Sequence, residues 1–463
     1  MKHIKEYIMV LSASFVLGSC TDRFFELTPS NEISVETFYK TADDFNQAVV
    51  ACYSKLQGQV SYYTEFCEFR SDNLYISAPT TSTQDRYDID RFVETSANGL
   101  LEDYWATFNN NIYRCNTVLD RIDEAKIDTS LINQYKGEAL FVRAYCYFNM
   151  CRVWGEVPVT RTVVSPKEAL KIGRCTKEEM YQYLYEDLTL AAKLLPKSYS
   201  GDDVGRATSG AALTLLGKVC LTFKEWEDAR DALKQVIGQY SLTTNPGDVF
   251  KVSNKQNSEI IFSIRYNKTI DGEGHGLWHS TLTPNDDNTH SDEMKNCYTT
   301  DDKRKELVSW VLIEGTSTYI MKKFYDTQDP TTLYVGNDWI LLRYADALLM
   351  YAEALNEIGY DNSASSEALS ALNQVHLRAG LAAVKIADVP DQNSFRNAIL
   401  LERQKEFPLE GHRWFDLVRM GGAIKAMEKV GLSIQEYQFV FPIPQTELER
   451  INNTHLLWQN PGY

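Results

Sequence analysis

The chain has 463 residues, of which 24% are charged and 44% hydrophobic, and its formal net charge at pH 7 is −16. This length and composition are ordinary for a globular protein and allow one large domain or about two to three smaller ones. An acidic balance of this size repels a phosphate backbone, which argues against nucleic acid as a partner, although a local basic patch can still attract an anionic ligand.

The N-terminus has the pattern of an export signal that ends at a cysteine. Two lysines precede the apolar run 7–17, which is too short to span a membrane and has the length of a signal-peptide core. The chain then reads Leu-Gly-Ser-Cys at 17–20, which resembles the lipobox of bacterial lipoproteins. We therefore expect residues 1–19 to be a signal peptide and Cys20 to carry a lipid anchor; a plain secretory signal with an incidental cysteine is the alternative.

Eight further cysteines follow, without the C-x-x-C spacing of a metal or redox site. Cys115, Cys146 and Cys220 lie in apolar helical patterns, which predicts that they are small buried side chains. An exported chain could pair some of its cysteines, and the spacing alone assigns no pairs.

Most long segments carry the apolar period of an amphipathic helix. In chain order, helices are expected at 38–56, 101–122, 134–153, 177–195, 209–222 and 226–237. Two stretches between them, 71–99 and 243–333, are polar and rich in loops, with short β-like runs at 259–266 and 318–324. Long loops in a compact domain are usually functional, so these stretches are the expected ligand face.

The stretch 213–237 has the spacing of a tetratricopeptide repeat. Leu216 and Gly217 lie on its first predicted helix, and Ala229 and Leu233 fall in the matching register on its second. The small residues allow two antiparallel helices to approach closely, which is the physical reason for the pattern.

A second copy is expected at 339–380, with Ala352 on its first helix and Ala368 and Leu372 on its second. More degenerate helix pairs are expected near 109–151 and 178–222. We therefore predict an all-α fold in which residues 20–463 form a single domain, a tetratricopeptide-like scaffold with large loop-rich insertions and a few short strands. Unrelated amphipathic helix pairs are the alternative.

Several motifs resemble those of one protein family, in the same order along the chain. They are CTDRFFELTP from Cys20, EFRSDN at 68–73, LLRYADALLMYAEALNEIG at 341–359 and ERQKEFPLEGHRWFDLVRMG at 402–421. On these motifs the chain resembles the SusD/RagB nutrient-binding lipoproteins of the Bacteroidetes outer membrane. The resemblance implies a tetratricopeptide-like helical fold, no cofactor and a binding role in place of catalysis. It also implies a lipid-anchored protein of the outer membrane that faces the cell exterior and delivers oligosaccharide to a SusC-like TonB-dependent transporter.

Carbohydrate binding needs a flat aromatic face and directional polar groups, and the two loop-rich stretches supply both. The candidates are Trp278, Tyr298 and Trp310 in the later stretch, and Asp72, Tyr75 and Arg86 in the earlier one. Asp72 matches the family's Ser-Asp position, whereas the others are placed by region only. Each has a structural alternative, because an Asp–Arg pair can be a purely structural ion pair and Trp310 can pack within a strand. Four other tryptophans are expected in the core: Trp105, Trp226, Trp339 and Trp414.

Metal binding and catalysis have weaker support. His275 and His279 are four apart, but they lie in a glycine-rich loop where no helix is expected, so no metal site is predicted. The oxygen-rich stretch 284–293 lacks the spacing of an EF-hand loop. The charges at 402–406 and 411–416 could pass for a glycosidase carboxylate pair, but their helical spacing favours a structural role, with His412 as a partner inside it. A surface glycoside hydrolase, a protein-interaction scaffold and a peptide-binding variant remain alternatives to glycan binding.

Overall fold

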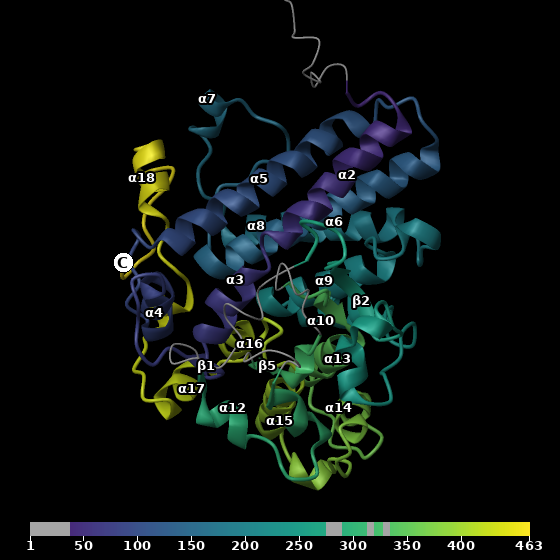
Figure 1. Ribbon diagram of the computed structural model, residues 1–463, viewed down its shortest axis with the longest axis vertical. Coiled ribbons are helices and arrows are strands. Elements are labelled where there is room, and N and C mark those ends of the chain that lie inside the picture. Colours follow the sequence, from purple (N-terminus) through teal and green to yellow (C-terminus); the bar gives the residue numbers. More distant parts are fainter. Residues whose placement is uncertain (1–37, 275–288, 313–318, 327–333) are drawn as a thin grey trace, which may run out of the picture.

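The computed structural model of the protein describes residues 38–274, 289–312, 319–326 and 334–463 (Figure 1). The helices in these ranges are α2 (Ala42–Gln57), α3 (Ser61–Tyr63), α4 (Gln84–Arg91), α5 (Gly99–Ile122), α6 (Thr129–Trp154), α7 (Pro166–Ala169), α8 (Lys177–Leu194), α9 (Ser209–Phe223), α10 (Trp226–Lys234), α12 (Asp292–Asn296), α13 (Tyr344–Ile358), α14 (Glu367–Arg378), α15 (Gln392–Glu406), α16 (Arg413–Arg419), α17 (Ala423–Lys429) and α18 (Gln445–Ile451). The strands are β1 (Leu74–Tyr75), β2 (Ile260–Ile264), β3 (Thr289–His290), β4 (Trp310–Leu312), β5 (Tyr319–Met321) and β6 (Trp339–Arg343). A π-helix, Thr64–Phe69, continues α3.

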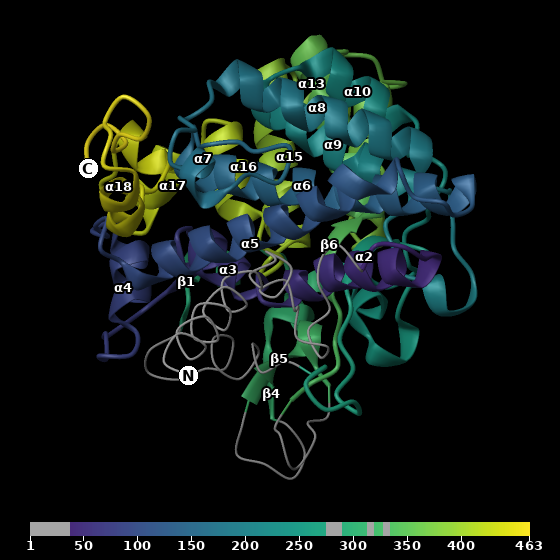
Figure 2. The same ribbon diagram turned by 90° about the horizontal axis from the view of Figure 1, so that it is seen from above.

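Successive helices pack side by side into one stack. α5 packs along α6, α6 along α8 and α8 along α9, and the series continues through α10 to α13 and α14. Figure 2 shows α8, α9, α10 and α13 on one side of the molecule, while β4 and β5 project from the other side. This arrangement confirms the all-α, tetratricopeptide-like scaffold with a few short strands.

Small residues set the distance between the stacked helices. A Cβ atom on Gly217 of α9 would lie 2.5 Å from Cγ of Leu233 on α10. Earlier in the stack, a Cβ atom on Gly137 of α6 would lie 2.8 Å from Cγ of Leu195. Contacts this short admit no side chain, so the role predicted for Gly217 is confirmed.

The helix limits agree with the predicted ones to within a few residues, and capping explains one difference. The first described helix begins at Ala42 because Thr41 is its N-cap. The Thr41 hydroxyl accepts from the backbone N–H of Asp44 at 3.2 Å, and the Asp44 carboxylate accepts from the N–H of Thr41 at 2.8 Å. This reciprocal capping box satisfies two amides that the helix itself leaves without a partner.

One part of the second predicted repeat is wrong. Trp339 begins the strand β6, which pairs antiparallel with β2, and the first helix of this repeat begins only at Tyr344. Residues along β6 are buried on both faces, so the run lacks the alternation that distinguishes a half-buried strand from a helix. The β-like runs predicted at 259–266 and 318–324 contain β2 and β5, and β4 pairs antiparallel with β5.

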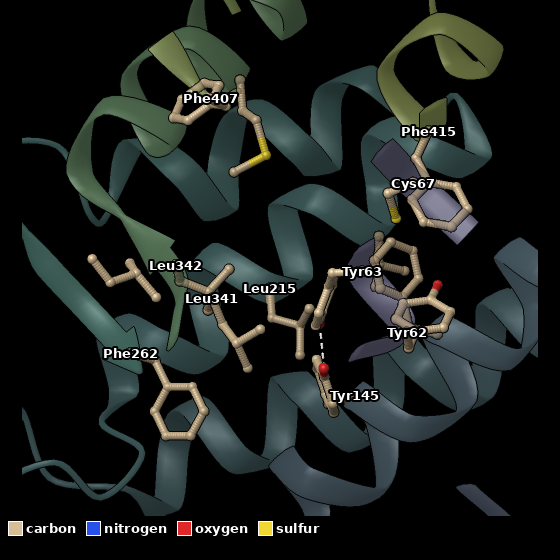
Figure 3. Packing of buried hydrophobic residues seen from close by; sticks show 14 of the residues in the cluster. Tyr62, Tyr63, Cys67, Tyr145, Leu215, Phe262, Leu341, Leu342, Phe407 and Phe415 are labelled. Atoms are coloured by element: carbon tan, nitrogen blue, oxygen red, sulfur yellow. Dashed lines mark hydrogen bonds between the residues drawn. The ribbon is translucent and has the colours of Figure 1, made fainter. Parts of the chain in front are cut away.

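The hydrophobic core runs through the helical stack and continues into the segments before α5 and after α14. Tyr63 forms a hydrogen bond with Tyr145 of α6 (Figure 3). The ring of Tyr63 also stacks on Trp339, with ring centroids 5.4 Å apart. Three thiols are free and buried, as predicted: Cys115, Cys146 and Cys220. Of the tryptophans expected in the core, Trp226 is half-buried against it, and three are buried: Trp105, Trp339 and Trp414.

A network of buried ion pairs crosses this core. The guanidinium of Arg343 on β6 contacts carboxylates of Glu259, Glu406 and Glu410, each at 2.7 Å. Its side chain is only 1% exposed. Removing one partner of a buried ion pair leaves the other charge without compensation, which is strongly destabilising. This network therefore holds β6, β2 and the end of α15 together.

The charged segments 402–406 and 411–416 belong to the same interior. Arg403 bridges Asp346 and Asp416, both at 2.8 Å, and none of the three is exposed to solvent by more than a few per cent. Nδ1 of His412 lies 3.5 Å from Nζ of Lys218. Burial, and next the Lys218 ammonium, hold the pKa of His412 well below its usual value. The structural role predicted for these segments is confirmed.

Candidate functional site

A short strand pair joins the two loop-rich stretches of the chain. Tyr75 of β1 lies opposite Thr289 of β3. The contact continues at Ser291, whose backbone N–H donates to the carbonyl of Asn73 at 2.9 Å. The two parts of the predicted ligand face therefore meet here, although they are far apart in sequence.

A cleft of about 390 Å³ opens beside this strand pair, and we name it the strand-pair cleft. Its volume lies within the range of small-molecule sites, roughly 300–1,000 Å³. Its walls come from the chain around β1, from the end of α4, from the start of α12 and from the end of α17. The lining residues are Ser71, Asp72, Leu74, Tyr75, Asp90, Arg91, Ser291, Asp292, Glu293, Lys429, Val430 and Leu432.

Asp72 lies at the wall of this cleft, held by Arg413 of α16. Nε of Arg413 lies 2.6 Å from Oδ1 of Asp72, and Nη2 lies 2.7 Å from Oδ2. The Asp72 side chain is 2% exposed. A buried bidentate pair of this kind fixes both groups, so Asp72 shapes the cleft and its carboxylate is occupied by the guanidinium.

Arg86 lies outside the strand-pair cleft. Its Nε and Nη2 donate to the two carboxylate oxygens of Glu65 at 2.6 and 2.7 Å. This pair holds α4 against the π-helix, so the structure gives Arg86 a structural role and does not bring it to Asp72, which pairs with Arg413 instead.

Tyr75 and Trp310 are the two predicted aromatic residues that this strand pair holds near the surface. Tyr75 is 37% exposed and lines the cleft. Trp310 is half-buried and stacks on His290 of β3, with 4.3 Å between ring centroids and 23° between ring planes. Burial lowers the pKa of His290 to about 3, with Lys295 adding to the shift. The imidazole of His290 is therefore neutral near pH 7, and the charge of the His290–Trp310 stack does not change around that pH.

Tyr298 is a correction to the predicted ligand face. It is 6% exposed, and its hydroxyl donates to the backbone carbonyl of Lys405 at 3.1 Å. Burial raises the pKa of this hydroxyl well above its usual value. Tyr298 is thus a core residue, placed there because α12 and the chain after it fold back onto the end of α15. Trp278 and Cys20 lie outside the described residues.

The polar rim of the cleft was missed by the sequence analysis. Asp90 accepts from the N–H of Ile76 at 3.1 Å, and Nε of Arg91 lies 3.2 Å from the same carboxylate. Across the mouth of the cleft, Nζ of Lys429 lies 3.4 Å from Oε2 of Glu293. No motif or period relates the end of α17 to the start of α12, so only the tertiary structure shows that these charges share a cleft.

Asp90, in the wall of the cleft, makes the stability of the folded protein depend on pH. Burial raises the pKa of Asp90 to about 6, while the Ile76 N–H and Arg91 act in the opposite direction. The folded protein therefore holds the proton of Asp90 more tightly than the unfolded chain does. The contribution of Asp90 to the free energy of unfolding is largest at pH values below the pKa of the unfolded chain and is lost as pH rises through about 6.

Replacing Asp90 with Asn should remove this dependence, because a side-chain amide can still accept from Ile76 but does not titrate. We expect the stability of the variant relative to wild type to rise by about 1–2 kcal/mol between pH 5 and pH 7.5. Urea unfolding at the two pH values measures this difference. An unchanged difference would show that Asp90 keeps an ordinary pKa in the folded protein.

Within the described ranges, no group of three or more His, Cys, Asp or Glu side chains is arranged to hold a metal ion. His290, which lies close in sequence to His275 and His279, is buried beneath Trp310. His275 and His279 lie outside the described residues. The strand-pair cleft combines the exposed ring of Tyr75 with charged side chains, which makes it the candidate binding site, and Asp90, whose pKa is raised, belongs to its wall.

These features define a class: a helical-repeat protein whose loop-rich segments form a candidate binding cleft. Two family models match the chain, one described as the SusD family over residues 312–463 and one as starch-binding and associating with the outer membrane over residues 24–221. Together they span more than half of the chain. The chain belongs to the SusD/RagB family, a family associated with the outer membrane. None of the helices in the described ranges is long and apolar enough to cross a membrane.

Relatives of similar length support this assignment. Two SusD-like proteins of Formosa agariphila are 27% and 28% identical to the chain, each covering at least 96% of both sequences. Among solved structures, a laminarin-binding SusD-like protein is 26% identical, with a TM-score of 0.77 over 92% of this chain and 100% of its own. Surface glycan-binding protein A from Bacteroides thetaiotaomicron, in complex with laminarihexaose, has a TM-score of 0.76 at 20% identity, covers 90% of this chain and 99% of its own, and shares the fold.

Proposed function

We propose that the protein binds oligosaccharides at the strand-pair cleft and releases no product from them. The observation that carries this proposal is the exposed ring of Tyr75, which lines the cleft beside its polar rim. The half-buried ring of Trp310, which stacks on His290 of the same strand pair, adds aromatic surface next to it. Aromatic faces stack on the C–H side of a sugar ring, and charged groups such as Arg91 and Glu293 meet its hydroxyls. Because a structural relative with 26% identity is named as laminarin-binding, laminarin is the first ligand to test.

The proposal extends to the place of the protein in the cell. Residues 1–19 would direct export, and Cys20 would carry the lipid that holds the domain 20–463 on the outer membrane, facing the exterior. There the protein would pass captured glycan to a SusC-like TonB-dependent transporter. Family membership and the description of the family as associated with the outer membrane support this part. Trp278 remains a predicted ligand contact.

Replacing Tyr75 or Trp310 with Ala should weaken glycan binding. Loss of one stacking contact is worth at least about 1 kcal/mol, which is about a fivefold increase in Kd. Isothermal titration of laminarin oligosaccharides into the soluble chain measures the effect. Tyr113→Ala is the matched control, because Tyr113 is 54% exposed on α5 and does not line the cleft. Equal affinity in all four proteins would place the site elsewhere.

The same samples separate this proposal from its rivals. Reducing ends that accumulate with time, and that one Asp or Glu substitution abolishes, would identify a glycoside hydrolase. Recovery of a barrel partner by pull-down, with no glycan or peptide bound, would identify a protein-interaction scaffold. Binding of a peptide library in place of glycans would identify the peptide-binding variant.

A further inference from the structure

A second and larger cleft lies on the other side of β4. It has a volume of about 640 Å³ and lies between the 3₁₀ turns Pro246–Phe250, Lys303–Val308 and Lys322–Phe324. Val311 of β4 lines it, whereas the preceding residue, Trp310, packs against the β1–β3 strand pair. Successive side chains of a strand point to opposite faces, so Val311 faces this second cleft while Trp310 faces the β1–β3 strand pair. Figure 2 shows β4 and β5 projecting from the side of the molecule opposite α8, α9, α10 and α13.

This second cleft is rich in lysine, and we name it the lysine cleft. Two of its lysines are paired at the rim: Nζ of Lys251 lies 2.5 Å from Asp248, and Lys322 pairs with Glu306. A third, Lys323, is buried in the wall, where its ammonium donates to Glu410 at 2.6 Å. These three charges are compensated by neighbouring carboxylates.

The fourth lysine of this cleft, Lys303, is different. Its side chain is exposed, and within the described ranges its ammonium has neither a carboxylate nor a hydrogen-bond acceptor in reach. The residue is nevertheless well placed, because its backbone N–H donates to the carbonyl of Ala379 at 3.0 Å and its stem passes over Gly380. Among the described residues, the cleft therefore presents one positive charge without a paired carboxylate, on a protein whose net charge is −16.

Apolar and aromatic surface lies beside this charge. Phe250, Leu307 and Val311 line the cleft. Tyr325, at its edge, is 36% exposed. An apolar floor, a partly exposed phenol ring and the Lys303 ammonium, which has no paired carboxylate among the described residues, together complement a ring-shaped ligand that carries a negative charge.

We propose that the lysine cleft binds an anionic sugar residue, with Lys303 contacting its carboxylate or sulfate group and Tyr325 its ring. This inference rests on the proposed function for the saccharide nature of the ligand, and on Lys303 for its charge. Acidic glycans therefore gain affinity from the lysine cleft that neutral glycans do not.

The test compares Lys303→Glu with Lys305→Glu. Both residues are exposed lysines of the same 3₁₀ turn, but Lys305 does not line the cleft, so the two variants have the same net charge and differ only in the site. The probes are oligoglucuronate, a sulfated oligosaccharide and neutral laminarin oligosaccharides, titrated by calorimetry at low and physiological salt. Tyr325→Ala is the second variant, because it removes the ring without changing charge.

We expect Lys303→Glu to weaken binding of the acidic probes at least about fivefold, more at low salt, and Lys305→Glu to change it less than about twofold. Tyr325→Ala should weaken the same probes, and neutral laminarin should bind all variants alike. Comparison of the uronate and sulfate probes identifies the anionic group. Equal effects of the two lysine variants, or binding of neutral laminarin without binding of any acidic probe, would overturn this inference and leave the proposed function standing. Absence of binding to every probe would overturn the proposed function as well.

Discussion

Replacing Arg343 with Met should destabilise the protein by about 3–5 kcal/mol, the largest loss that we expect from a single substitution. The substitution keeps the length of the side chain but removes the charge that Glu259, Glu406 and Glu410 share. Each of these carboxylates lies 2.7 Å from the guanidinium. Their remaining partners cannot compensate three buried negative charges, so the strand pair β2–β6 should separate from the end of α15. Urea unfolding followed by circular dichroism measures the loss.

Arg396→Met is the matched control for this prediction. Arg396 also forms a bidentate pair with a glutamate, Glu357, at 2.6 and 2.7 Å, but its side chain is 26% exposed. Water compensates the carboxylate left behind, so the cost should be at most about 1 kcal/mol. Similar losses in the two variants would show that burial does not set the strength of the Arg343 network.

Replacing Gly217 with Ala should destabilise the protein by about 2–3 kcal/mol, against the ordinary preference of a helix for alanine. A Cβ atom at this position would lie 2.5 Å from Cγ of Leu233, which is fully buried. The added methyl group and the Leu233 side chain cannot both fit in their present positions. Either α9 and α10 must separate, or Leu233 must change its rotamer. Thermal unfolding followed by the circular dichroism of the helices checks the sign and size of the change.

Gly359→Ala provides the comparison for this second prediction, because a Cβ atom there meets no atom within 4 Å and the backbone is extended. It should leave stability within about 0.5 kcal/mol of wild type. If Gly217→Ala were as stable as Gly359→Ala, close packing of the paired helices would not depend on the small residue, and the physical basis of the predicted repeat would fail.

Much of the helical scaffold was predictable from periodicity, and the exceptions have physical causes. Helices such as α2 and α8 bury one face against neighbours, so their apolar stripes are visible in sequence. Trp339 was placed in a helix because β6 is buried on both faces and its apolar run shows no period of two. The two-residue strands β1 and β3 are too short to give any pattern.

The candidate site was predicted in its region and only partly in its residues. Tyr75 and Trp310 were named because carbohydrate binding needs aromatic faces and the loop-rich stretches supply them, and both are partly exposed. Tyr298 was named for the same reason, yet it is buried, since composition does not show how a loop folds back. Asp72 pairs with Arg413, whose position much later in the chain local spacing could not relate to it.

The most direct test of the account is a crystal structure of the soluble chain with the oligosaccharide that binds it most tightly. The account predicts sugar rings in the strand-pair cleft, within contact distance of Tyr75 and Trp310, with the glycan chain intact. Sugar bound on the helical stack, on the side away from β1 and β3, would contradict it, as would a cleaved product held between carboxylates.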